Sequence, residues 1–129
     1  MPVKNTFVFT ELNTEDPDKA KKFYKSLFAW KLSDQEMGED VYTMIDTGVR
    51  TSGGGMQKKG EGPTAWLPYV EVADVKRTIA KAQKLGAQVL VPFQPIGEMG
   101  SIGIFVDPTG AKMGVWARAK KKAKRSARK

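Results

Sequence analysis

The chain has 129 residues, of which 40% are hydrophobic and 28% charged, a composition typical of a soluble protein with one compact domain or two small halves. It contains neither cysteine nor histidine, which excludes disulfides, thiolate nucleophiles, the commonest general base and the commonest transition-metal ligand. Eight of the 22 basic residues lie in 118–129, so residues 1–117 hold 14 basic and 14 acidic residues, and the net charge of +8 comes from the C-terminal segment.

The first half of the chain predicts a strand, a helix and three further strands. The strand covers residues 6–13, and the helix begins with Asp16 as its N-cap and Pro17 at its first position. Apolar residues then recur at helical spacing, namely Ala20, Phe23, Tyr24 and Leu27. The following strands are expected at 30–34, 41–46 and 49–57.

The second half predicts the same order of elements. A polar, glycine-rich linker at 58–63 precedes a strand at 66–72, and Asp74 caps a helix that ends at Gly86. The apolar face of this helix is formed by Val75, Ile79, Ala82 and Leu85, and three more strands are expected at 87–93, 102–107 and 111–117.

These matching halves indicate an internal duplication. The helix-capping aspartates Asp16 and Asp74 are 58 residues apart, and the hairpin aspartates Asp46 and Asp107 are 61 apart. We therefore expect an α+β fold of two tandem βαβββ modules, whose mixed sheets close around a cleft because a lone half would leave one sheet face bare. The modules are assigned to 1–57 and 65–117, with a linker at 58–64 and a tail at 118–129.

The tail RAKKKAKRSARK contains no acidic residue and is expected to be disordered. Such a tail can contact nucleic acid or another anionic surface weakly and in a salt-dependent manner, or it can be a solvated extension without a specific role. No apolar run approaches the roughly 18 residues that cross a bilayer. The N-terminal MPVKNTFVF lacks the long apolar region of a secretory signal, so we expect a cytoplasmic protein without membrane contact.

Three segments resemble the signature regions of the vicinal oxygen chelate superfamily, which includes glyoxalase I, bleomycin-resistance proteins and extradiol dioxygenases. They are ELNTEDPDKAKKFYKSLFAW, YVEVADVKRTIAKAQKLGA and FVDPTGAKMGVW, and the resemblance spans roughly residues 5–117. It implies paired βαβββ modules with a cupped sheet around the ligand, in agreement with the duplication.

Metal-using members of this superfamily hold a divalent ion through His, Glu or Gln from four strands. By resemblance, the corresponding positions here are Phe9, Leu67, Gly114 and, in the first half, Ser52 or Gly53. None of these residues is a good ligand for a divalent ion. The sequence therefore predicts a member without the usual metal ligands, and with no cofactor.

Strand alternation identifies side chains that would line the cup or, alternatively, fill the core between sheet and helices. The candidate ligand-binding residues are Phe9, Glu11, Trp30, Tyr42, Met44, Met56, Leu67, Tyr69, Phe93, Met99 and Trp116. An aromatic and methionine-rich lining suits an apolar or planar ligand, with a carboxylate to orient it.

Candidate acid–base groups on these strands are Glu11, Tyr69 and Glu71, although a glutamate at a strand end is more often ion-paired or exposed. The run Gly53-Gly54-Gly55 lacks the residues of a phosphate loop, and predicts a close approach of a ligand or of the facing sheet.

These observations predict a homodimer that binds a small organic ligand without a metal, similar to the bleomycin-resistance branch. One alternative is a glyoxalase-like lyase or isomerase that uses glutamate and tyrosine or an atypical divalent metal. Another is a nucleic-acid-associated protein that acts through its tail.

Overall fold

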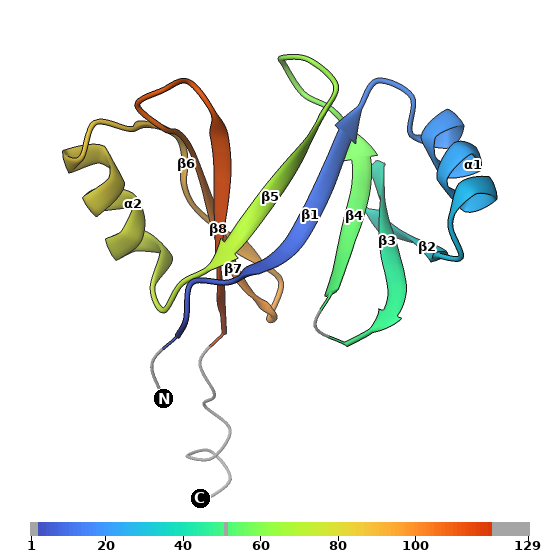
Figure 1. Ribbon diagram of the computed structural model, residues 1–129, viewed down its shortest axis with the longest axis horizontal. Helices are drawn as coiled ribbons and strands as arrows, with labels where there is room; N and C mark the ends of the chain where they lie inside the picture. Colours follow the sequence, from blue (N-terminus) through green and yellow to red (C-terminus); the bar gives the residue numbers. More distant parts are fainter. Residues whose placement is uncertain (1–2, 51, 120–129) are drawn as a thin grey trace, which may run out of the picture. The chain divides into compact units, whose positions relative to one another are not determined.

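The computed structural model describes residues 3–50 and 52–119, which form eight strands and two helices. In chain order these are β1 (Phe7–Thr14), α1 (Pro17–Leu27), β2 (Lys31–Met37), β3 (Asp40–Val49), β4 (Ser52–Lys58), β5 (Ala65–Glu71), α2 (Val75–Lys84), β6 (Gln88–Ile96), β7 (Gly100–Val106) and β8 (Lys112–Arg118). The order strand, helix, three strands occurs twice, which confirms the predicted βαβββ duplication (Figure 1). The disordered tail was expected from residue 118, but Arg118 is the last residue of β8. From residue 120 onward the tail lies outside the described residues.

Both helices begin where their capping residues predict. The Asp16 carboxylate accepts a hydrogen bond from the Lys19 main-chain N–H at 3.0 Å, and Asp74 accepts one from Arg77 N–H at 3.0 Å. Each interaction satisfies one of the free amides at a helix start. Gly86, with φ of 103°, follows the end of α2 in the left-handed conformation that glycine adopts readily.

Only part of each predicted apolar helix face packs against the sheet. In α1 only Ala20 and Tyr24 contact the core, whereas Phe23 and Leu27 are exposed. A helix that meets its sheet along one narrow i, i+4 stripe leaves the flanking i+3 and i+7 positions in solvent. Leu85 is also exposed, because it lies at the C-cap of α2 where the backbone leaves the helix.

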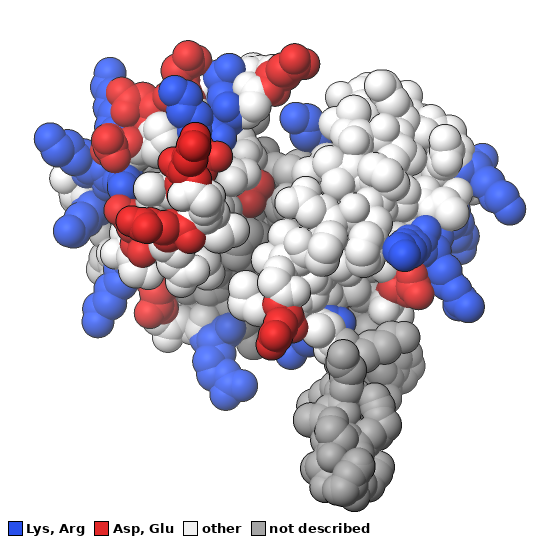
Figure 2. All heavy atoms as spheres, turned by 180° about the vertical axis from the view of Figure 1, so that it is seen from behind, with Lys and Arg blue, Asp and Glu red and all other residues white. Residues whose placement is uncertain are grey.

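The first compact unit, Thr6–Val70, is called the α1 unit here. Its strands are ordered β2-β3-β4-β1-β5, with β1 and β4 parallel and the other neighbours antiparallel. The helix covers one face of this sheet, over a core of Leu12, Ile45 and Met56 with Tyr24, Trp30, Leu32 and Trp66 packed around it. Figure 2 shows basic and acidic side chains interspersed over this unit, in the left half of the view.

The second compact unit, the α2 unit, comprises residues 3–5 and 71–119. Its strands are ordered β8-β7-β6, and α2 packs on them over Val72, Val75, Ile79, Val115 and Ala117. All of β5 except Glu71 belongs to the α1 unit, although β5 is the first strand of the second βαβββ repeat in the sequence. Neither helix in the described part of the chain combines the length and apolar character needed to span a membrane.

Candidate functional site

The α1 unit has a second sheet face, which α1 does not cover. Side chains alternate along each strand, so the residues that flank Leu12, Ile45 and Met56 point to this opposite face. Glu11 lies near its centre, paired in register with Gly55 on β4 and Leu67 on β5. We call this surface the Glu11 face. Its residues are Phe9, Glu11, Asn13, Tyr42, Met44, Gly55, Gln57, Leu67 and Tyr69.

The carboxylate of Glu11 is held by three neutral donors from three strands. Its Oε2 accepts a hydrogen bond from the Tyr42 hydroxyl at 2.9 Å. Its Oε1 accepts from the Tyr69 hydroxyl at 3.3 Å and from Asn13 Nδ2 at 3.2 Å. Gln57 Nε2 in turn donates to Asn13 Oδ1 at 2.9 Å, so the amide that contacts Glu11 is itself fixed.

Most of this hydrogen-bond network is shielded from solvent. Glu11 is 8% exposed and Tyr69 is 2% exposed. Burial, and then the negative charge of Glu11, raise the pKa of both Tyr42 and Tyr69 above the usual phenol value. Both side chains therefore remain protonated near neutral pH and act as hydrogen-bond donors. Of the two roles that the sequence left open for Tyr69 as an acid–base group, a raised pKa favours the proton donor over the base.

Gly55 explains how Tyr42 reaches Glu11. A methyl group added at Gly55 would overlap the Tyr42 hydroxyl and ring. The absent side chain thus leaves the space in which the phenol crosses β4 toward the carboxylate. The sequence predicted the close approach of a ligand or of the facing sheet at the glycine run. At Gly55 the approaching group is instead a tyrosine side chain from the neighbouring strand β3 of the same sheet.

The structure brings together six of the candidate ligand-binding residues. On the Glu11 face, Phe9 contacts Tyr69 edge-to-face with ring centroids 5.8 Å apart. Leu67 is buried there, and Met44 and Tyr42 are partly exposed. These are side chains with which an apolar ligand can make contact around a fixed carboxylate.

Two other candidates lie on the helix-covered face. Met56 is 0% exposed in the core with Leu12, and Trp30 stacks against Tyr24 with ring centroids 5.7 Å apart. Both therefore fill the core beneath α1. The expected grouping of these residues with Glu11 is corrected by the strand phase: because Gly55 pairs with Glu11, its neighbour Met56 must point to the other side.

The remaining candidates belong to the α2 unit. Glu71 is paired with Arg118, with Oε2 and Nε 3.3 Å apart, which is the ion-paired alternative foreseen for a strand end. Phe93 and Met99 are exposed, and Trp116 is partly buried on β8. Sequence reasoning missed Asn13 and Gln57, although each lies two residues after Glu11 or Gly55 on the same strand face.

A divalent metal does not fit these residues. Structural and catalytic sites use at least three charged or strongly donating ligands, whereas Phe9, Leu67 and Gly114 offer no side-chain donor. Within residues 3–50 and 52–119 no group of three or more Asp, Glu, His or Cys side chains is placed to hold an ion. On the Glu11 face, Glu11 is the sole carboxylate, and its hydrogen-bonding neighbours are protonated phenols and amides.

The structure is an α+β fold of paired βαβββ modules, with a buried, hydrogen-bonded carboxylate on the sheet face that α1 does not cover. A family model for the Glyoxalase/Bleomycin resistance protein/Dioxygenase superfamily matches residues 6–115. The chain is 37% identical over 114 residues to "Putative glyoxylase CFP32" of Mycobacterium bovis and of Mycobacterium tuberculosis, an alignment that covers 84% of the chain. It therefore belongs to the glyoxalase/bleomycin resistance protein/dioxygenase superfamily, as its motifs predicted.

The match covers only 44% of the length of these curated relatives. Among solved structures, the hypothetical protein BH1468 from Bacillus halodurans C-125 superimposes with a TM-score of 0.69 at 9% identity, covering 92% of this chain and 98% of that one. Methylmalonyl-CoA epimerase from Mycobacterium tuberculosis gives 0.68 at 11% identity, covering 97% of this chain and 93% of that one. At such identities the likeness shows a shared fold.

Proposed function

We propose that this chain binds a small organic molecule at the Glu11 face without a divalent metal. The observation that carries the proposal is the buried Glu11 carboxylate, held by Tyr42, Tyr69 and Asn13 beside partly exposed apolar side chains. A carboxylate offers about four acceptor positions, of which three are occupied here. The remaining position can accept an N–H or O–H group from a ligand.

The surroundings define the ligand class. Phe9, Met44 and the ring of Tyr42 provide apolar and aromatic contacts, which favour a planar or apolar body. The neutral donors around Glu11 leave its negative charge uncompensated by any cation on this face. A ligand that carries a basic nitrogen next to an aromatic ring would therefore combine a charge-assisted hydrogen bond with apolar contact.

The test is a thermal-shift screen of small aromatic amines, followed by calorimetric titration of the hits. A ligand at 100 times its Kd should stabilise the wild-type chain by about 2.7 kcal/mol. Glu11→Gln keeps the shape but removes the charge, and should weaken binding about tenfold or more. Glu36→Gln, at an exposed position of β2, is the matched control and should bind as the wild type does. Equal affinities of Glu11→Gln and wild type, or binding abolished by EDTA, would contradict the proposal.

A second candidate is an isomerase or lyase of the glyoxalase type, in which Glu11 moves a proton next to a carbonyl group. The position of a carboxylate among protonated phenols favours it, because the base and the hydroxyl donors are adjacent. In this case purified protein should turn over methylglyoxal with glutathione, and Glu11→Gln should lower kcat by roughly 100-fold or more while Glu36→Gln does not. Assays with and without added Zn²⁺, Ni²⁺ or Mn²⁺ test the atypical-metal version. Absence of turnover under all these conditions removes this candidate and leaves ligand binding.

A further inference from the structure

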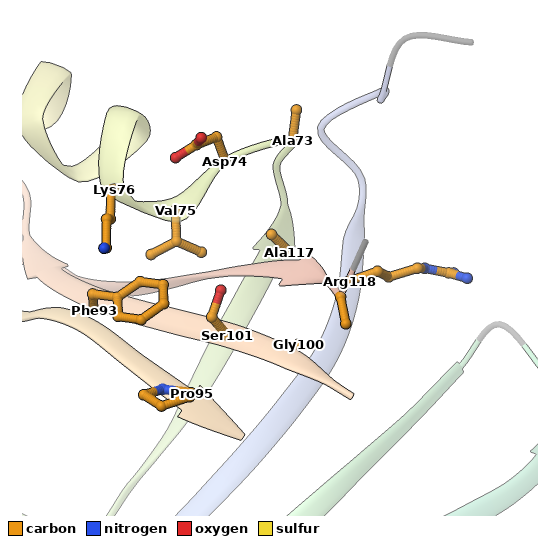
Figure 3. Close-up of a pocket in the computed structure, with 11 residues that line it drawn as sticks. Ala73, Asp74, Val75, Lys76, Phe93, Pro95, Gly100, Ser101, Ala117 and Arg118 are labelled. Carbon is orange, nitrogen blue, oxygen red and sulfur yellow. The ribbon is translucent and has the colours of Figure 1, made fainter. Parts of the chain in front are cut away.

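The α2 unit contains a cavity of about 340 Å³ between the start of α2 and strands β6, β7 and β8 (Figure 3). Its residues are all distinct from those of the Glu11 face. Val75 and Ala117 form a buried floor, at 2% and 5% exposure, and Phe93 and Pro95 of β6 form an apolar wall. Sites for small molecules commonly measure roughly 300–1,000 Å³ and are mainly apolar with a few polar groups. The volume lies at the lower end of that range, and the space is open to solvent, since Lys76, Phe93 and Pro95 are exposed.

The wall is unusual because a large aromatic ring faces open space. Phe93 is 40% exposed, although its ring lies beside the buried core of the unit. The Lys76 ammonium lies over this ring, with Nζ 4.5 Å from the ring centroid. Figure 3 shows Lys76, Val75 and Phe93 converging on the same space, with Ser101 beside them.

The charged side chains around the cavity indicate the charge of the ligand that it would bind. Lys76 forms no ion pair with any of the residues that the structure describes. Asp74 is committed as the helix cap, and its carboxylate turns toward the first turn of α2 in Figure 3. The Arg118 side chain is paired with Glu71 and points away from the cavity. Among the described lining residues, Lys76 is thus the one charge that faces the cavity without a carboxylate or a helix cap as its partner.

From this arrangement we propose that the cavity binds a small organic anion with an aromatic or apolar body. The carboxylate or sulfonate of the ligand meets the Lys76 ammonium, with the Ser101 hydroxyl as a second donor. The apolar body lies against Phe93 and Pro95, over Val75 and Ala117. Burial of the ring surface supplies affinity, and the single cation supplies the preference for an anion.

The probe for this site is 1-anilinonaphthalene-8-sulfonate, an aromatic sulfonate whose fluorescence rises in an apolar environment. Titration of the wild-type chain should show saturable binding. Lys76→Met keeps an unbranched chain but removes the charge, and should weaken binding about tenfold. Lys84→Met removes the same charge from the far end of α2 and should leave the Kd within about twofold, because an exposed distant charge contributes little.

Two further variants separate the cavity from other surfaces. Ser101→Phe fills the space and should abolish saturable binding, while an unchanged circular dichroism spectrum shows that the variant is folded. Deletion of residues 120–129 should leave the Kd unchanged. The proposal is overturned if the wild type does not bind the dye, if Lys76→Met and Lys84→Met behave alike, if the filled variant binds normally, or if the deletion removes binding.

Discussion

Gly54→Ala is expected to destabilise the chain by about 3 kcal/mol, a cost typical of forcing a methyl group into fully occupied space. β1 and β4 run parallel, with Thr10 opposite Gly54. A side chain at Gly54 would overlap the main-chain carbonyl of Thr10 and would also meet Ile45 Cδ1 at 3.5 Å. A backbone group cannot rotate away as a side chain can, so the two central strands must separate. In a domain of this size, the melting temperature should fall by roughly 10 °C.

Gly60→Ala provides the matched control for this substitution. Gly60 lies in the loop after β4, has no heavy atom within 4 Å of an added methyl group, and is absent from the glycines with positive φ. Alanine there should leave the melting temperature unchanged or raise it slightly, because it restricts the unfolded chain. Thermal unfolding followed by circular dichroism measures both variants. Similar melting temperatures for Gly54→Ala and Gly60→Ala would show that the strands do not approach as closely as described.

The glycine run illustrates what sequence alone can establish. Three successive glycines in a strand predict close approach, and the expected partner was a ligand or the facing sheet. The partners differ, however: a carbonyl of β1 at Gly54 and the Tyr42 phenol at Gly55. Neither could be named in advance, because the parallel pairing of β1 with β4 and its register are set by contacts far apart in the chain.

The helices were more predictable because their signals are local. Asp16 and Asp74 each accept a hydrogen bond from an amide three residues later, so the sequence within one turn determines the start of the helix. The helical spacing of apolar residues wrongly predicted that Phe23 and Leu27 pack against the sheet. Their exposure depends on how much of the sheet α1 covers, which is not a local property of the sequence.

For the candidate site, the sequence correctly predicted which residues of one strand share a sheet face. It did not predict which residues of different strands share that face. Phe9 and Glu11 share a face because they are two residues apart, and Tyr69 joins them because it pairs directly with Phe9. Met56 was grouped with them by its residue type, yet its strand places Gly55 in that position. Asn13 and Gln57 lacked a chemical signature and would have been found only by applying the two-residue period to Glu11 and Gly55.

The stability of the folded chain is expected to fall steeply in alkaline solution because of Tyr42 and Tyr69. Burial, followed by the charge of Glu11, raises the pKa of both phenols in the folded state, whereas in the unfolded chain they titrate near pH 10. Above that pH the unfolded state has lost protons that the folded state retains, so the free energy of unfolding decreases as pH rises. Each phenol contributes up to about 1.4 kcal/mol per pH unit, so the pair should remove roughly 3 kcal/mol between pH 10 and 11.5.

Chemical denaturation of wild type and Tyr69→Phe at a series of pH values tests this linkage. At neutral pH the variant should be about 1 kcal/mol less stable, because the hydrogen bond from Tyr69 to Glu11 is lost. Above pH 10 the free energy of unfolding of the variant should fall with pH at half the wild-type rate, because one of the two phenols is gone. The two stability curves therefore converge above pH 10 and then cross. Tyr24→Phe, on the helix-covered face and without contact to Glu11, should retain the wild-type slope. Curves for wild type and Tyr69→Phe that stay parallel to pH 11.5 would mean that Tyr69 ionises freely in the folded chain, and the coupled carboxylate site described above would then be incorrect.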